Sequence, residues 1–441
     1  MPNHRPPTQI LEVLQKIEYE DALVDGDSRY VETELARGSA KTFSTLAKKF
    51  GWSPSTKQFF APNDKHVVFF GHIGSGKTTE LRRYARKLND SRRFYVVEVD
   101  VLAKLDRNNL QYTEALMAMA ETLLERLSND GYTLGEDALQ PLRSWFAHGV
   151  QTRSQSSELS AEVKTGLKAG AGIPGLAKVF ASFTAAFKTG SSQKTEWRQE
   201  IRNRFTTLAD AFNQLIGAVE AELQAQHRAQ RVLFLIDGTD KMSGDDTQKF
   251  FVQDAEQLLA IQTLAIYTAP LHLKYDGRLG GKLDADLVLP MIKLQERDGT
   301  RCEAGWVALR SLLLLRADRS LFASDADIER LVEHCGGHPR ELLRLLKLCC
   351  EIADEKVNAT VVERAIQKLA SEYRYFLQPD DYVLLCSIDA DLFNSGNGAR
   401  AQELLHRLAL LQYNDGLWRR SHPVVRTLEG YTNAGISTPS A

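Results

Sequence analysis

The chain has 441 residues, which is too long for one ordinary hydrophobic core, and about two to four domains are expected. Hydrophobic residues make up 43% and charged residues 25%, a balance that excludes disorder over most of the chain. The 55 basic and 57 acidic side chains nearly cancel, so no global field attracts nucleic acid or an anionic membrane, and such binding would need a local patch.

Cysteine usage and the absence of long apolar runs point to a cytoplasmic protein. The cysteines are odd in number and lack paired C-x-x-C spacing, so we expect reduced, buried thiols. They are Cys302, Cys335, Cys349, Cys350 and Cys386. The first residues contain no apolar signal region, and the longest apolar runs are too short to span a bilayer.

The first 300 residues predict an α/β core behind a short lead-in. Residues 1–60 carry a helical pattern at Ile10, Leu11, Leu14 and Ile17 and are expected to form a small helical lead-in. Within 61–300, short apolar runs alternate with helical segments, the pattern of a parallel sheet covered on both faces. The expected strands are His66–Phe70, Phe94–Val99, Arg231–Ile236, Leu264–Thr268 and Leu287–Leu289.

Residues 150–195 interrupt this alternation and are interpreted as an insertion. A polar stretch is followed by a Gly/Ala-rich segment whose lysines meet no acid between Glu162 and Glu196. One stripe of a helix is predicted at Leu176, Val179, Phe180, Phe183 and Phe187. The stripe either docks on the α/β core or forms a cationic amphipathic helix for a partner or a membrane.

Beyond residue 300 the strand signals stop. Helices are expected at Trp306–Leu315, Asp325–Cys335, Pro339–Ile352 and Thr360–Tyr373, and 301–373 is interpreted as a helical lid. In 374–432, helices near Asp381–Ile388 and Ala399–Leu411 precede a hairpin that turns at Asn414-Asp415-Gly416. Helix, helix, hairpin is the order of a winged helix. Residues 433–441 are expected to be a loose tail.

The segment Gly71 to Thr78 satisfies G-x-x-x-x-G-K-[ST] between a predicted strand and a predicted helix. Its glycines let successive backbone N–H groups converge on phosphates, and the helix that follows adds its positive end. Lys77 is expected to reach the β- and γ-phosphates of ATP, and the Thr78 hydroxyl to ligate Mg²⁺. The predicted nucleotide contacts are Gly71, His72, Ile73, Gly74, Ser75, Gly76, Lys77, Thr78 and Thr79.

A carboxylate for the magnesium shell is expected at the end of a buried strand beside the phosphate-loop strand, and Asp237 fits this position. Many P-loop ATPases have a water-orienting Glu immediately after this acid, but here the neighbour is Gly238. Asp240 is the candidate for that role, with a helix cap or turn as the alternative. Thr268, at the end of another strand, either touches the γ-phosphate or water, or simply ends the strand.

Two arginines are further candidates. Arg278, in a polar loop, could stabilise charge on a neighbouring subunit's transferring phosphate. Arg340 follows the Gly336-Gly337-His338-Pro339 junction between two helices of the predicted lid. It either binds the γ-phosphate when the lid closes or forms a surface salt bridge.

With these residues assembled, the chain resembles the AAA+ and STAND branch of P-loop NTPases, including NACHT-like proteins, and is similar to origin-recognition ATPases in domain order. The matching segments lie at 71–79, 232–240 and 336–342 and in the strand ending at Thr268, within a resemblance that covers about 60–430. The family's lid motif implies that Pro339, with Arg340, contacts the nucleotide. No long repeat array follows the predicted winged helix in this sequence, so the sensor region typical of STAND proteins is expected to be missing, or to reside in a partner chain or in the 150–195 insertion.

Three functions remain open at this point. The first is an ATP-binding and slowly hydrolysing conformational switch with Mg²⁺, which the resemblance associates with bacterial defence or signalling. Such a switch would act as a homo-oligomer or through a protein partner, with 150–195 as the candidate surface. The second is a DNA-loading ATPase that uses the winged helix, which is not favoured because 391–430 contains five arginines against four acids. The third is nucleotide binding without turnover.

Overall fold

A five-stranded, all-parallel sheet forms the centre of the computed structural model, which describes residues 4–38, 41–106, 110–151, 172–189, 193–242, 244–275, 277–391, 398–416 and 418–437. The strand order is β2-β3-β4-β1-β5. The strands are β1 (Lys65–Gly71), β2 (Phe94–Asp100), β3 (Arg231–Asp237), β4 (Leu264–Pro270) and β5 (Ala285–Val288). All five predicted strands are present, within two residues of their expected ends.

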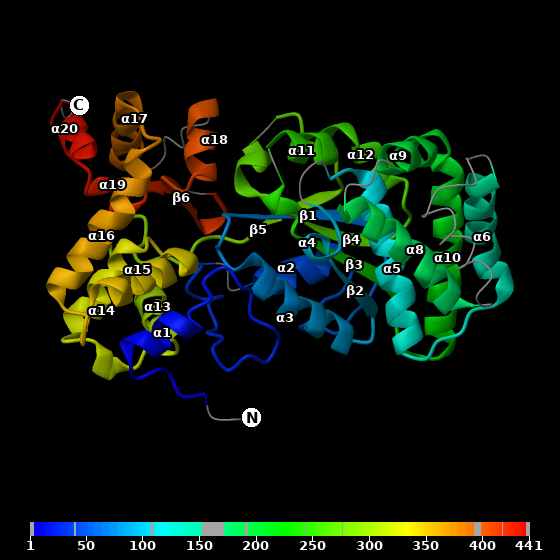
Figure 1. The fold of residues 1–441 in the computed structure, drawn as a ribbon, viewed down its shortest axis with the longest axis horizontal. Helices are drawn as coiled ribbons and strands as arrows, with labels where there is room; N and C mark the ends of the chain where they lie inside the picture. Colours follow the sequence, from blue (N-terminus) through cyan, green and yellow to red (C-terminus); the bar gives the residue numbers. More distant parts are fainter. Residues whose placement is uncertain are drawn as a thin grey trace.

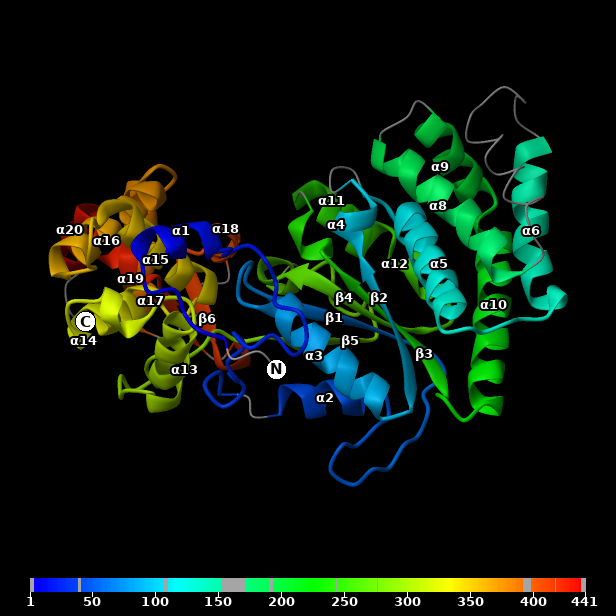
Figure 2. The same cartoon turned by 60° about the horizontal axis from the view of Figure 1, so that its bottom comes forward.

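Both faces of the sheet are covered, as continuous apolar strands require. On one face, α2 (Thr42–Lys49) and α3 (Lys77–Asp90) pack against alternate strand residues such as Val67 and Phe69. Figure 2 shows these two helices below the sheet. On the other face, α5 (Tyr112–Asn129) packs on β2 and α10 (Phe205–Ala225) packs on β3.

The expectation that the Asp237 strand lies beside the phosphate-loop strand is wrong. β4 pairs with both β1 and β3 and separates them, with Phe69 of β1 opposite Thr268 of β4. Strand order depends on long-range crossovers that strand patterns do not encode. Asp237 still reaches the loop because α3 crosses the sheet toward β3.

A helical insertion between β2 and β3 is larger than the predicted 150–195. It contains α4 (Val101–Lys104), α5, α6 (Glu136–Gln151), α8 (Ile173–Thr189), α9 (Gln193–Asn203) and α10, and lies at the right of Figure 1. The predicted α8 stripe is real, and each of its members is at most 1% exposed. It packs mainly on α5, with Phe183 against Trp197 of α9 at 4.6 Å between ring centroids. The stripe is therefore core of the insertion rather than a free surface.

Apart from β4, the chain between β3 and β5 forms short helical elements. They are η1 (Thr239–Lys241), α11 (Gly244–Gln248), the π-helical turn η2 (Lys249–Gln253), α12 (Ala255–Leu259) and η3 (Leu271–Tyr275). Residues 152–171 and 190–192, which include much of the predicted 150–195 insertion, lie outside the described residues.

A helical block follows the sheet, at the left of Figure 1. It consists of α13 (Glu303–Leu314), η4 (Arg319–Leu321), α14 (Asp325–His334), α15 (Pro339–Ile352) and α16 (Ala359–Arg374). The predicted helices are all present, and α15 has the predicted bounds because His338 caps it and Pro339 occupies its first turn.

The C-terminal unit has the predicted order of helix, helix and hairpin. Its elements are α17 (Pro379–Ala390), α18 (Ala399–His406), β6 (Leu410–Tyr413), η5 (Asn414–Gly416), β7 (Trp418–Ser421), α19 (Pro423–Arg426) and α20 (Glu429–Ser437). The helix predicted to reach Leu411 ends at His406, because Leu408 has a φ of 62° and Leu410 begins β6. Residues 433–437 of the predicted loose tail are helical, since α20 continues to Ser437 and packs on α17, and 438–441 lie outside the described residues.

The N-terminal 60 residues are not one lead-in unit. The first helix, α1 (Ile10–Lys16), packs on α15 of the helical block, whereas the following segment runs along α3 of the core. Figure 2 shows this blue segment passing between the two parts. All five cysteines are buried, as predicted, and no helix among the described residues has the length and apolarity needed to cross a bilayer.

The buried α8 stripe gives a first prediction. Replacing Phe183 by Ala leaves a cavity beside Trp197 and should destabilise the insertion by about 3–5 kcal/mol. Replacing Lys178, on the exposed face of the same helix, by Ala should change stability by less than about 0.5 kcal/mol. Urea unfolding followed by tryptophan fluorescence measures both, and equal effects would contradict the packing of α8.

Candidate functional site

The phosphate loop has the backbone geometry that its glycines predict. β1 ends at Gly71 and α3 begins at Lys77, with Gly76 as its N-cap residue. Gly74 and Gly76 have φ values of 82° and 97°, which residues with a Cβ rarely adopt. A Cβ on Gly74 would also lie 2.7 Å from Nε of Arg340, so the loop and the helical block approach each other closely here.

Lys77 is almost wholly buried, with a relative exposure of 4%. Its Nζ donates to the carbonyl oxygens of Gly71 and His72, each at 2.9 Å, and forms an ion pair with Oδ2 of Asp240 at 2.7 Å. The positive charge that the sequence assigns to phosphate binding is therefore held by an internal carboxylate. A buried ion pair of this kind can be exchanged only for another well-placed negative charge.

Asp240 is held by Lys77 and by Thr268. Burial opposes its ionisation, but the charge of Lys77 and the hydrogen bond from it prevail and lower the pKa of Asp240. The Thr268 hydroxyl donates to Oδ1 of Asp240 at 3.3 Å and accepts from the backbone N–H of Gly238 at 3.0 Å. In this structure, Thr268 thus fixes the turn that carries Asp240, a positioning role that the sequence did not suggest.

The backbone conformation and the close approach of α4 explain why a glycine follows Asp237. Gly238 has a φ of 92°, and a Cβ there would lie 2.9 Å from Cγ of Leu102 in α4. A glutamate at this position would be strained and would collide with α4. The tight turn instead leads into η1 and brings Asp240 toward Lys77.

Thr78 and Asp237 line the same small pocket beside the ends of β2 and β3, and the Thr78 hydroxyl acts to lower the pKa of the Asp237 carboxyl. Burial and the nearby charge of Asp240 raise the pKa of Asp237, and its buried Oδ1 has no hydrogen-bond partner among the described residues. A hydroxyl beside an unsatisfied carboxylate oxygen is the donor set that Mg²⁺ uses in nucleotide sites. These residues therefore fit the predicted metal.

A pocket opens in front of Lys77 between three parts of the chain. The phosphate loop and α3 contribute Gly74, Gly76, Lys77, Thr78, Thr79 and Glu80; the N-terminal segment contributes residues that include Tyr19, Leu23, Tyr30, Val31 and Arg37; the helical block contributes Leu312, Arg316, Pro339, Arg340 and Leu343. Pro339 and Arg340 thus lie in the same pocket as Lys77, as the predicted nucleotide contacts require. The Thr79 hydroxyl accepts from the backbone N–H of Leu23 at 3.1 Å.

Two loop residues predicted to touch nucleotide also bind neighbouring units. The His72 ring accepts a hydrogen bond from the backbone N–H of Gln412 in β6 at 3.0 Å, and burial together with Lys77 lowers its pKa to about 3. The carbonyl of Ile73 accepts from Nε2 of His338, the cap of α15, at 2.9 Å. The phosphate loop is therefore in direct contact with both the helical block and the hairpin.

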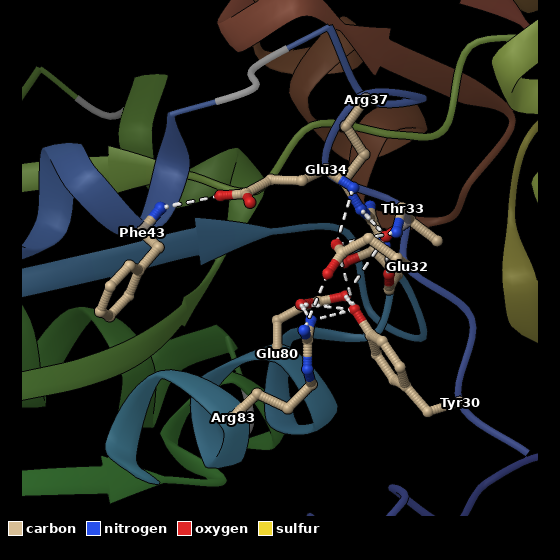
Figure 3. Close-up of polar contacts among 9 residues, drawn as sticks. Tyr30, Glu32, Thr33, Glu34, Arg37, Phe43, Glu80 and Arg83 are labelled. Atoms are coloured by element: carbon tan, nitrogen blue, oxygen red, sulfur yellow. Dashed lines mark hydrogen bonds and ion pairs between the residues drawn. The ribbon is translucent and has the colours of Figure 1, made fainter. Parts of the chain in front are cut away.

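Several residues of the pocket could not be recognised from the sequence. Glu80, one turn after Lys77, is 5% exposed and accepts hydrogen bonds from Tyr30, Thr33 and Arg83 at 3.1–3.4 Å. Figure 3 shows the N-terminal segment crossing α3 at these contacts. Glu80 belongs to no sequence motif, and only the fold brings it to the N-terminal segment.

Arg278 lies elsewhere. It is exposed in a turn that follows η3 and does not line the pocket of its own chain. A role in a neighbouring subunit's site stays a prediction.

Comparison with known proteins finds only solved structures of low similarity. No family model and no curated protein matches the chain. Solved structures similar to it include a Walker-type ATPase of Pyrococcus abyssi (13% identity, 93% of this chain and 99% of that chain, TM-score 0.41). Others are the ORC1 protein of Aeropyrum pernix in complex with DNA (13%, 90% and 80%, TM-score 0.36) and Cdc6p of Pyrobaculum aerophilum (12%, 88% and 85%, TM-score 0.39).

These proteins belong to the groups that the sequence resembles, but the overall similarity is loose. The chain's own features define its class, because a glycine loop joins the parallel strand β1 to α3 and places Lys77 at the carboxyl edge of the sheet. It has the fold of a P-loop NTPase.

The Lys77–Asp240 pair gives a second prediction. Asp240→Asn leaves the buried Lys77 charge uncompensated and should destabilise the nucleotide-free protein by about 3 kcal/mol at neutral pH. Because the folded-state pKa of Asp240 is lowered, this difference should shrink as the pH falls through that pKa. ATP should raise the melting temperature of the variant more than that of the wild type, since its phosphates replace the lost charge.

Asp90→Asn, at the exposed end of the same helix, is the control and should behave as the wild type in both measurements. An Asp240→Asn protein with wild-type stability and a wild-type response to ATP would show that the pair has no energetic role.

Proposed function

We propose that this chain binds MgATP in the pocket in front of Lys77, hydrolyses it slowly, and uses the nucleotide to change the position of the helical block relative to the sheet. One observation carries the proposal: the pocket is closed jointly by the phosphate loop, the N-terminal segment and the helical block. A ligand bound there contacts all three, so its affinity depends on their relative positions, and they respond to it in turn.

The charges lining the pocket suit a polyphosphate. Six basic side chains, among them Arg37, Lys77, Arg316 and Arg340, line it against four acids, and guanidinium groups favour phosphate oxygens through paired hydrogen bonds. Burial, followed by the charge of Arg29, lowers the pKa of Arg316 to about 10, so this group gains from a nearby anion. Tyr19, Leu23, Leu312 and Leu343 provide apolar surface for a base.

ATP binding would require Lys77 to leave Asp240 for the phosphates. Arg340 supports a response in the helical block, since its Nε is buried and has no hydrogen-bond partner in the described part of the chain. A γ-phosphate would offer Lys77 and Arg340 a shared acceptor, whereas ADP would not. This difference is the basis of the proposed switch.

Slow hydrolysis follows from the same residues. Thr78 and Asp237 would hold Mg²⁺, which would supply positive charge to the phosphates when bound. Once released by Lys77, Asp240 is the carboxylate available to orient water, and its lowered pKa suits orientation better than proton abstraction. Because Gly238 removes the usual Glu, binding without turnover is the competing outcome, and a phosphate-release assay separates the two.

The DNA-loading alternative gains no support from the C-terminal unit. Its arginines are used within the protein: Arg400 pairs with Asp381, Arg407 with Glu403, Arg426 with Asp389, Arg420 bonds Gln295, and Arg419 is buried against Gln412. Phosphate tracking needs uncompensated cations on the surface. A role in bacterial defence or signalling, through a homo-oligomer in which Arg278 reaches a neighbour or through a protein partner, is the form of switch that we favour.

Nucleotide binding has a direct test. Lys77→Ala should weaken MgATP binding by at least about 100-fold in isothermal titration calorimetry, because a buried charge-assisted contact is lost. Lys87→Ala removes an exposed lysine from the far end of the same helix and should bind as the wild type. Unchanged affinity in folded Lys77→Ala protein would refute the site.

The switch has a separate test. ATP, compared with ADP, should change the radius of gyration of the wild type in small-angle X-ray scattering. Arg340→Ala should abolish that change while weakening ATP binding by no more than about tenfold. Lys356→Ala, an exposed site beyond α15, should retain the change. An Arg340→Ala protein that still responds to ATP as the wild type does would exclude Arg340 as the contact that moves the block.

A further inference from the structure

We propose that Arg37 is a positioning residue of the nucleotide site, which holds the phosphate loop and couples it to the connector, residues 289–302, that leads from β5 to the helical block. This inference rests on the proposed function and adds to it a residue outside every motif of the sequence.

The guanidinium of Arg37 joins three segments that are far apart in the chain. It is 2% exposed, and its Nε donates to the Thr33 hydroxyl at 2.9 Å. One terminal nitrogen donates to the carbonyl of Ser75 in the phosphate loop at 2.8 Å, and the other donates to the carbonyl of Pro290 in the connector. A planar group with fixed donor directions can satisfy these acceptors only while the three segments keep their relative positions.

The orientation of Arg37 is itself fixed by α3. The Thr33 hydroxyl that accepts from Arg37 donates to Oε1 of Glu80 at 3.2 Å, and Tyr30 and Arg83 hold the same carboxylate. Figure 3 shows these side chains converging between the N-terminal segment and α3. Any displacement of the first turn of α3, which begins at Lys77, therefore acts on Arg37 through Thr33.

The charge of Arg37 also bears on the site. Its three acceptors named above are a hydroxyl and two carbonyls rather than a carboxylate, and burial lowers its pKa while Glu80 acts in the opposite direction. Arg37 lines the pocket together with Gly76 and Lys77. A polyphosphate in the pocket would stabilise this charge at short range, which strengthens the bonds to Ser75 and Pro290 when nucleotide is bound.

The connector contacts both the helical block and the C-terminal hairpin, so it links the position of Arg37 to both of them. The backbone N–H of Met291 donates to the carbonyl of Gln412 in the hairpin at 3.3 Å, and that of Lys293 donates to the carbonyl of Ala36 at 2.8 Å. Gly305, at the start of α13, lies directly against the Lys293 carbonyl. The connector is thus held between Arg37, the hairpin and the first helix of the block.

Hydrogen–deuterium exchange and calorimetry on the full chain test the coupling, with a slowly hydrolysed ATP analogue and Mg²⁺ as the probe. In the wild type, the analogue should protect both the loop 71–78 and the connector 289–302. In Arg37→Gln, the dissociation constant should rise by about tenfold or more, and at saturating analogue the loop should be protected while the connector is not. Arg37→Lys should not restore connector protection, because one ammonium group cannot reach all three acceptors.

Arg198→Gln is the matched control. Arg198 is a buried arginine that pairs with Glu114 in the helical insertion, and its replacement should leave affinity and connector protection unchanged. Thr33→Val is the milder variant, which removes the acceptor of Nε together with the hydrogen bond from Thr33 to Glu80 but keeps the guanidinium, and it decides the question if Arg37→Gln does not fold. It should raise the dissociation constant by about two- to fivefold and reduce connector protection.

The outcomes are distinguishable. If the wild type binds no analogue, the proposed function itself fails. If the wild type binds and the Arg37 and Thr33 variants show wild-type affinity and full connector protection, the function stands and the role of Arg37 is wrong.

Discussion

A lysine buried in front of a glycine loop must have a negative charge beside it, and much of this protein is arranged to supply one. Here Asp240 does so at 2.7 Å, presented by the turn that Gly238 permits and that Thr268 fixes. The cost of burying both charges is offset by their contact and by the hydrogen bonds from Lys77 to two carbonyls and from Thr268 to Asp240, and a better-placed anion could replace Asp240 in this arrangement. ATP and Asp240 therefore compete for one cation, which makes the loop a natural point of control.

The parts that surround this loop contact it directly, so a change in the partner of Lys77 would alter their contacts with the loop. His338 holds the carbonyl of Ile73 from the helical block, and Gln412 bonds the His72 ring from the hairpin. The N-terminal segment completes the enclosure, since α1 packs on the helical block and the residues that follow bind α3. The helical block, the hairpin and the N-terminal segment therefore all meet near one short loop. Figure 1 shows the elongated molecule that they form with the sheet.

The sequence predicted what depends on local pattern. The glycine loop, the five apolar strands and the capped start of α15 at Pro339 all follow from neighbouring residues. It did not predict that β4 separates β1 from β3, or that the α8 stripe packs on α5, because both depend on crossovers. It gave no sign of Arg37 or of the Lys77–Asp240 pair, since a buried arginine and an acid after a strand gain their meaning only from residues brought near by folding.

A structure of the protein with Mg²⁺ and a slowly hydrolysed ATP analogue tests the central claim most directly, through the position of one nitrogen atom. The account predicts that Nζ of Lys77 has left Asp240 for a phosphate oxygen, with the metal ion between Thr78 and Asp237. A nucleotide bound elsewhere, or a phosphate loop in which Lys77 is still paired with Asp240, would contradict it.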